Sequence, residues 1–289
     1  MSETVLTGGE GFTDAVTFAF ADRAAGFFGL ARAGVATGPD GLQGSALGVL
    51  FAGREPVGVL AQGENALGAE ADWDELRMPG LVVRSLEPQA RWQVTLDVQD
   101  GSGFDLEFTA VSPPAELSED DDAAQLGGMA GEERLCRVSG TAAGHRIDCL
   151  GQRGRTWGVA DWSRIALTRS LAAWLDNGTS LTVAAVRPTD AESHADEVTW
   201  GALLDADGAV DVADPRISTT YDGDGHQRRA GLELWMTEED GYPVRAAGEA
   251  ICGSSLELGA LTLDLAFFRW RAEGVEGVGR YDVLRKSAA

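Results

Sequence analysis

Apolar and polar positions alternate along most of this chain. In residues 92–98, Trp92, Val94 and Leu96 share one parity, and polar residues occupy the positions between them. Successive side chains of a strand point to opposite faces, so this pattern is typical of strands that bury one face. On this basis we predict strands near residues 15–20, 45–52, 56–62, 81–86, 92–98, 104–110, 134–140, 144–150, 163–175, 179–187, 197–204, 229–236, 243–251, 255–270 and 274–284.

Tight turns separate several of these runs. Asp100-Gly101 lies between two alternating stretches, and Asp176-Asn177-Gly178 lies between two others. Both are strong hairpin signals. Some fifteen short antiparallel strands joined by such turns are typical of β-barrels, whose interior holds side chains or one small ligand. The pattern therefore predicts an all-β protein, and its length suits two barrels.

Residues 112–128 differ from the rest. Pro113-Pro114 interrupts the strand pattern, and positions 119–122 form a run of four acidic residues. Prolines break sheets, and blocks of like charge stay solvated. We therefore expect an N-terminal barrel over 1–111, an acidic linker over 112–128 and a C-terminal barrel over 129–289.

Charge and hydropathy exclude several classes of partner. The net charge of −23 opposes binding to nucleic acid, whose phosphates would be repelled. No apolar run reaches the length of about 18 residues that a membrane-spanning helix needs. The first residues have neither the basic region nor the apolar core of a signal peptide. We expect no nucleic-acid partner, no membrane insertion and a cytoplasmic protein.

The usual catalytic and cofactor signatures are missing. The sequence has no Walker loop, no nucleophile elbow and no dinucleotide fingerprint, and its single lysine is Lys286. The three cysteines form no Cys-x-x-Cys pair, and the three histidines show no metal-ligand spacing. We therefore expect buried, unreactive thiols, no cofactor and no metal.

The stretch 151–162 is the densest in charged and aromatic side chains that could bind a ligand or take part in catalysis. It supplies our candidate ligand-binding residues, which are Arg153, Arg155, Trp157, Asp161 and Trp162. An arginine can form a planar ion pair with a carboxylate and can stack on an indole ring. We predict that one of the arginines pairs with Asp161 while Trp157 packs on the guanidinium. The cluster would either close the end of a barrel or line a site.

Candidate catalytic residues are few. Arg155 and Asp161 come from the same stretch, and His194 lies close to Glu197, where a carboxylate could raise the histidine pKa. The alternative for His194 and Glu197 is a polar loop leading into the next strand. Residues 221–226 superficially resemble a calcium loop, but they lack the downstream glutamate and are expected to form a turn.

Two short stretches carry a resemblance to a known family. Residues 151–158 resemble the Gly-Tyr-His-Asp-His-Asn-Trp-Gly stretch of the carotenoid 1,2-hydratase/AttH-like family, and 274–282 resemble the final strand of its uncharacterised bacterial branch. The resemblance implies two lipocalin-like antiparallel β-barrels packed side by side, the second opening with this motif. Trp157 and Gly158 match the motif.

The residues that hydration would need do not match. Arg155 stands where the family has the histidine two positions before the tryptophan, and Arg153 replaces the earlier histidine. Residues 181–187 contain neither the tyrosine nor the aspartate that the family would place in a following strand. An arginine is a poor general acid at neutral pH. The resemblance therefore supports the fold more than a hydratase activity.

Three functions agree with these observations. The favoured one is binding of a hydrophobic small molecule, such as a terpenoid, a polyketide or a lipid-like compound, in a barrel or between barrels. The second is an enzyme of hydratase, isomerase or cyclase type acting on such a molecule. The third is a structural or interaction protein whose barrels are filled by side chains.

Overall fold

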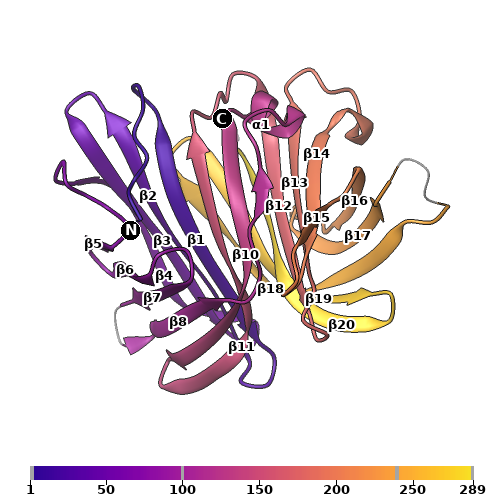
Figure 1. The fold of residues 1–289 in the computed structure, drawn as a ribbon, viewed down its shortest axis with the longest axis horizontal. Coiled ribbons are helices and arrows are strands. Elements are labelled where there is room, and N and C mark those ends of the chain that lie inside the picture. The colour runs from indigo at the N-terminus through magenta and orange to yellow at the C-terminus, as the bar shows by residue number, and fades with distance from the viewer. Residues whose placement is uncertain (1–2, 99–100, 238–240, 288–289) are drawn as a thin grey trace. The chain divides into compact units, whose positions relative to one another are not determined.

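The computed structural model describes residues 3–98, 101–237 and 241–287, and strands dominate its regular structure (Figure 1). The chain divides into two compact units. The first unit comprises Met1–Val111 with Gly131–Val159, and the second comprises Ser112–Ala130 with Ala160–Ala289. Within the described ranges, no helix is both long and apolar enough to cross a membrane. The all-β prediction is confirmed.

The first unit is built on one antiparallel sheet, with strand order β4-β3-β2-β1-β11-β10-β8-β7-β6-β5. Its strands are β1 (Thr13–Asp22), β2 (Phe27–Gly38), β3 (Gly41–Ala52), β4 (Glu55–Ala66), β5 (Glu75–Met78), β6 (Leu81–Glu87), β7 (Arg91–Leu96), β8 (Phe104–Ala110), β10 (Met129–Ala142) and β11 (His145–Gly158). Alternation within β1 places Val16, Phe18 and Phe20 in the core, as the pattern predicts.

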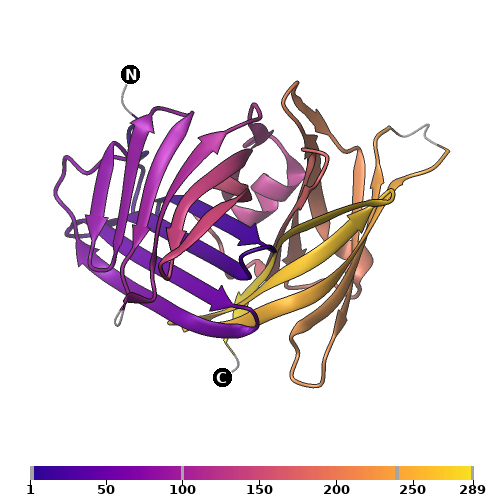
Figure 2. The ribbon, with the colours of Figure 1, turned by 90° about the horizontal axis from the view of Figure 1, so that it is seen from below.

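This sheet curls around its own core (Figures 1 and 2). Gly44 of β3 lies so close to the opposite edge strand that an added Cβ would be 2.8 Å from the Sδ of Met78 on β5. The interior is filled largely by aromatic rings. The centroid of Phe18 is 5.0 Å from that of Phe108 and 6.2 Å from that of Trp92. The interior of a barrel of about eight strands holds such side chains or one small ligand.

The division of the chain differs from the expected one. We expected everything after residue 128 to form the second barrel, but β10 and β11 join the first sheet, where β11 pairs with β1 and β10 pairs with β8. Each pairing satisfies the backbone hydrogen bonds of a strand that would otherwise form a sheet edge. The motif 151–158 therefore lies in the first unit.

The second unit is a nine-stranded antiparallel sheet with strand order β15-β14-β13-β12-β20-β19-β18-β17-β16. Its strands are β12 (Ile165–Leu175), β13 (Ser180–Pro188), β14 (Val198–Leu204), β15 (Ala209–Asp211), β16 (Asp214–Tyr221), β17 (Gln227–Trp235), β18 (Val244–Leu258), β19 (Leu261–Ala272) and β20 (Val275–Lys286). The two edge strands, β15 and β16, follow one another along the chain. A Cβ added to Gly201 of β14 would lie 3.2 Å from Pro215 of β16, so this sheet also curls until its two ends approach.

Two predicted hairpins are confirmed and one predicted strand is divided. β7 and β8 pair as expected, although Asp100 of their turn lies outside the described residues. β12 and β13 pair around Gly178, which has a φ of +86° that glycine adopts without strain. The single strand expected over 255–270 is instead interrupted by a two-residue turn, where Gly259 has a φ of +67°.

The expected linker has structure of its own. It contains β9 (Ala115–Leu117) and the short helix α1 (Asp122–Gly127). Glu119 and Asp120 are exposed, as a solvated acidic run predicts. However, Ala123 and Ala124 of α1 are buried, and a Cβ on Gly127 would be 3.3 Å from Val186 of β13. The segment packs on the second unit through the small residues that follow the acidic run.

Candidate functional site

The arginines of the 151–162 motif point into the core of the first unit. In the β1–β11 register, Phe18 stands opposite Arg153 and Val16 opposite Arg155. Opposite residues of an antiparallel pair share a face. Because Phe18 and Val16 belong to the core, the two arginine side chains enter it as well.

Arg153 is fully buried and held by two carboxylates. Its guanidinium forms ion pairs with Glu3 and with Glu132. The guanidinium also lies over the Trp92 ring, and its central carbon is 4.9 Å from the ring centroid. The Trp92 indole N–H donates to Glu3 Oε2 at 2.9 Å. Glu3 therefore accepts from both a guanidinium and an indole, which are the donors that stabilise a buried carboxylate.

Arg155 forms a second pair beside the first. Its Nε donates to Asp14 Oδ1 at 2.9 Å and its NH2 group donates to Oδ2 at 2.6 Å, while the Trp73 indole N–H donates to the same Oδ2 at 2.9 Å. Burial disfavours the charged form of Arg155, but the hydrogen bond and charge of Asp14 outweigh it and raise the pKa of this guanidinium above its ordinary value.

We call these residues the β11 arginine cluster: Glu3, Asp14, Trp73, Trp92, Glu132, Arg153 and Arg155. Each of its three carboxylates is paired with an arginine, and both indole N–H groups are bonded to carboxylates. The cluster joins strands that are far apart in the sequence. Glu132 also pairs with Arg134 at 3.4 Å, so that three arginines balance the three carboxylates, and removing one partner of such a buried pair is strongly destabilising.

The predicted pairing with Asp161 is wrong. Asp161 belongs to the second unit, is exposed, and accepts hydrogen bonds from the Ser163 hydroxyl at 2.6 Å and the Ser163 N–H at 3.0 Å, which lower the pKa of its carboxyl. Arg153 stacks on Trp92, not on Trp157. Strand alternation sends both arginines inward, whereas Asp161 follows the end of β11. The ligand-binding role of these residues stays a prediction.

The two tryptophans of the motif are separated as well. Trp157 is half-buried at the end of β11 in the first unit, directly opposite Asp14 in the register. Trp162 is half-buried in the second unit. The break falls after Val159, where the first unit ends. The motif is therefore a junction between the units and not one cluster.

Glu197, a candidate from the sequence, lies in a buried network of the second unit. Its side chain is only 4% exposed, and its Oε1 lies 3.0 Å from the NH2 group of Arg169 and 2.5 Å from that of Arg187. The side chain of His194 lies outside the described part of the structure. Asp196 accepts backbone N–H groups of Glu192 and Ser193, as expected for a polar loop, and these bonds lower its pKa.

Two hydroxyl groups continue this network. Arg169 donates to the Thr219 hydroxyl at 3.4 Å, and that hydroxyl lies 2.6 Å from the Tyr281 hydroxyl. Burial raises the pKa of Tyr281 to about 12, although the charge of Arg169 opposes this. Tyr281 therefore keeps its proton at neutral pH and can donate a hydrogen bond.

The strand registers explain why these groups meet. On the inner face, Leu171 of β12 stands opposite Tyr281 of β20, and Arg169 is the next inward residue of β12. Thr219 of β16 stands opposite Ala230, a core residue. We call this set the Arg169 network: Arg169, Arg187, Glu197, Thr219 and Tyr281. Sequence analysis missed four of its members, although a charged Arg169 within an apolar inward row was a usable signal.

The Arg169 network runs from the surface to the core. The Arg187 side chain is 23% exposed and Thr219 is half-buried, whereas Tyr281 is fully buried. From Tyr281 an aromatic row continues across the same face. Its centroid is 5.7 Å from that of Phe268, which is 5.5 Å from that of Trp270. Hydroxyl, guanidinium and carboxylate groups thus adjoin a row of aromatic rings.

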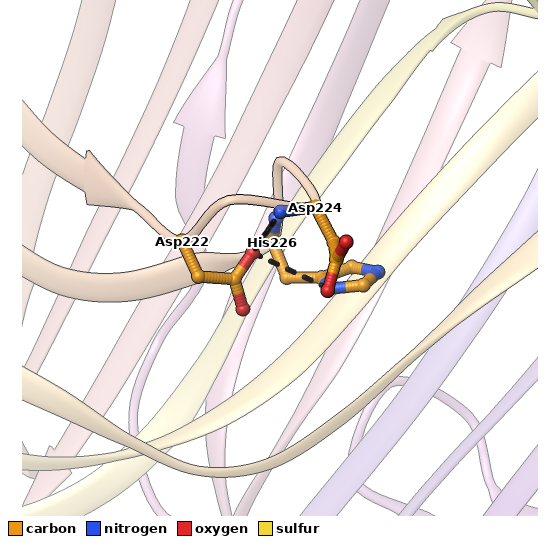
Figure 3. A group of neighbouring side chains, drawn as sticks. All are labelled: Asp222, Asp224 and His226. Carbon is orange, nitrogen blue, oxygen red and sulfur yellow. Dashed lines mark hydrogen bonds and ion pairs between the residues drawn. The ribbon is translucent and has the colours of Figure 1, made fainter.

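A smaller group lies in the turn between β16 and β17 (Figure 3). The ligand atoms of Asp222, Asp224 and His226 lie within 4.8 Å of one another. Asp222 Oδ1 accepts the N–H groups of His226 at 2.9 Å and of Asp224 at 3.0 Å, and the His226 bond lowers the pKa of the Asp222 carboxyl. These bonds build the turn that the sequence predicts.

Solved structures with a similar fold support the architecture. The chain is similar to an AttH-like protein of Nitrosomonas europaea, with a TM-score of 0.67, 12% identity, and coverage of 96% of this chain and 94% of that chain. It is similar to kievitone hydratase of Nectria haematococca, with a TM-score of 0.63, 11% identity, and coverage of 98% and 97%. It is also similar to CghA in a structure with Sch210972, with a TM-score of 0.62, 11% identity, and coverage of 99% and 95%.

At these identities the likeness establishes the fold, which is the double lipocalin-like architecture implied by the resemblance to the AttH-like family. A search of curated proteins finds no match. The family model described as "Domain of unknown function (DUF7064)" matches residues 6–286, so the chain belongs to this family.

Proposed function

We propose that the protein binds a hydrophobic small molecule, such as a terpenoid, a polyketide or a lipid-like compound, in its second unit. The observation that carries this proposal is the Arg169 network at the end of the Tyr281–Phe268–Trp270 row. Small-molecule sites combine mostly apolar walls with a few convergent polar groups. This face of the second sheet has both.

The two parts of the site would contribute differently. Burying about 300 Å² of apolar ligand surface contributes roughly 7 kcal/mol before ordering costs, whereas one hydrogen bond contributes about 1 kcal/mol. The aromatic row would therefore supply affinity, and the network would select ligands with a matching polar group. Arg187 and Thr219 are its accessible members, so that group would meet the network there.

A second candidate is an enzyme of hydratase, isomerase or cyclase type. Two observations support an enzyme: the fold is shared with kievitone hydratase and CghA, and the neutral Tyr281 hydroxyl is linked through Thr219 to the Arg169 guanidinium. With a pKa of about 12, Tyr281 is a weak acid that would polarise a carbonyl by hydrogen bonding more readily than it would protonate an alkene. This favours isomerisation or cyclisation over hydration.

Native mass spectrometry of protein purified from its own host tests the proposal. We expect a co-purified small molecule whose occupancy falls in Tyr281→Phe, because the substitution keeps the ring but removes the hydroxyl that is bonded to Thr219, an accessible member of the network. Tyr242→Phe is the matched control, since Tyr242 is 90% exposed. Bound ligand retained equally in both variants would contradict this site.

The same preparations separate the alternatives. A bound mass that changes on incubation, in the parent but not in Tyr281→Phe, would support the enzyme. Protein that carries no small molecule, and takes up none from a panel of terpenoids, polyketides and fatty acids, would favour the structural or interaction role.

A further inference from the structure

A short N-terminal segment closes the β11 arginine cluster without joining the sheet. We call residues 3–8 the strap. They form no strand, and polar contacts hold them to the first unit. The Glu3 N–H donates to Asp74, the Glu3 carbonyl accepts from the Trp73 N–H, and the Leu6 N–H donates to Asp14. The strap delivers the Glu3 carboxylate into the core, where it is 3% exposed.

The groups that hold this carboxylate belong to the sheet and have further contacts within it. Arg153 lies on β11, where Glu132 also pairs with it and the Trp92 ring supports its guanidinium. Trp92 lies on β7 and packs on Phe18. A guanidinium and an indole N–H therefore converge on one anionic position, fixed by contacts that do not involve the strap.

Glu3 does not use all the donors of this position. Its Oε1 pairs with the NH2 group of Arg153 and its Oε2 accepts from Trp92, whereas the buried Nε of Arg153 has no hydrogen-bond partner among the described residues. A buried donor without a partner costs free energy. A carboxylate that is not tethered to the strap could bind both Nε and the NH2 group of Arg153 in the bidentate geometry that arginine favours.

We propose that Arg153 and Trp92 form a carboxylate-binding site, and that Glu3 is a resident occupant which a free monocarboxylate with an apolar tail replaces when the strap opens. The charge of the ligand is limited to one because Glu132 and Asp14 already lie in the cluster. The tail is apolar because the position adjoins Phe18 and the Trp92 ring. This site lies in the first unit and is independent of the ligand proposed for the second.

The tether sets the concentration at which exchange occurs. A tethered group has an effective concentration on the order of millimolar or above. A free carboxylate therefore has to reach at least that range to open the strap of the parent protein. Removing the Glu3 side chain removes this competition, so the emptied site fills at lower concentration.

The test is rescue of Glu3→Ala by free carboxylates. We expect the variant to unfold at lower temperature than the parent, and hexanoate or acetate to raise its Tm saturably, hexanoate at the lower concentration. Sodium chloride at equal ionic strength should not do so. Glu10→Ala, at an exposed position of the same N-terminal region, should resemble the parent in every salt. Equal effects of chloride and carboxylate on Glu3→Ala would overturn the site.

A measurement on the parent keeps the proposal testable if Glu3→Ala does not fold. Hydrogen exchange of the Leu6 amide reports strap opening, because this N–H donates to Asp14 at 2.8 Å. We expect tens of millimolar hexanoate, but not chloride, to accelerate its exchange while the Val94 amide of β7 stays protected. An unchanged Leu6 rate at saturating hexanoate would show that Glu3 is permanent and not exchangeable.

Discussion

The two units bury arginine in different settings. In the first unit, Arg153 and Arg155 lie among aromatic rings, and the carboxylates beside them are fully engaged. In the second, Arg169 belongs to a chain of groups that ends in two hydroxyls and reaches the surface at Arg187. Every carboxylate of the β11 arginine cluster is already paired, so a ligand can enter it only by replacing one of them, as proposed for Glu3. A network with neutral donors and an accessible end is better suited to a ligand.

This difference between the two arginine settings argues against taking the stretch richest in charged and aromatic residues as the functional site. The stretch 151–162 carries the densest chemistry of the sequence, yet its arginines form the stabilising cluster. The network with groups suited to ligand binding is assembled from four separate strands and a loop, none of which stands out alone. The predictions below test this contrast, beginning with the largest effect.

The largest loss of stability is expected for Asp14→Asn. The amide keeps the size of the side chain but leaves the Arg155 guanidinium buried without a counter-charge, which costs about 3–5 kcal/mol. Urea unfolding measures the change, and Glu119→Gln on the exposed acidic run is the control, with an unchanged midpoint. A small loss for Asp14→Asn would mean that the β11 arginine cluster does not hold the first unit together.

A smaller loss is expected for Glu197→Gln. Arg169 loses a buried partner, but Arg187 is partly exposed and water can solvate it. We expect the free energy of unfolding in urea to fall by about 2 kcal/mol, which lies between the values for exposed and buried ion pairs. Glu233→Gln is the matched control, because Glu233 pairs with Arg245 on the exposed surface at 3.1 Å. If Glu197→Gln lowers the free energy of unfolding more than Asp14→Asn does, the contrast between the units is reversed.

Alkaline pH should weaken the first unit through Cys136. Burial raises the pKa of this thiol from 9.0 to about 12. Between these values the unfolded chain releases the proton and the folded chain keeps it, so stability falls as pH rises above 9, by about 1.4 kcal/mol per pH unit. Urea unfolding at pH 9 and pH 10 should show a shallower decline for Cys136→Ala. Identical slopes would indicate that the thiol is not buried.

The smallest effect is expected for Asp161→Asn. The carboxylate is exposed and bonded to Ser163 within its own turn, so its unfolding midpoint should match that of the parent. Thermal unfolding of the two proteins side by side is sufficient. A marked drop in midpoint would support the predicted ion pair between Asp161 and Arg153 or Arg155.

The local pattern of apolar and polar residues was sufficient to predict most strands and hairpins of the fold. Alternation along β7 identified a strand and its buried face, and Asp176-Asn177-Gly178 identified a hairpin. These features depend on side-chain direction and turn geometry over a few residues. The division of 255–270 was missed because a two-residue turn at Gly259 interrupts an otherwise continuous apolar alternation.

The sequence by itself therefore determined the all-β class, the barrel architecture and most strands of this protein. The tertiary structure decided which sheet β10 and β11 join, that Glu3 reaches Arg153 across 150 positions, and that Thr219 meets Tyr281. Strand pairing joins distant segments through backbone hydrogen bonds that are the same for almost any side chain. The partners of a buried charge are consequently fixed by register and curl, which no short stretch of sequence records.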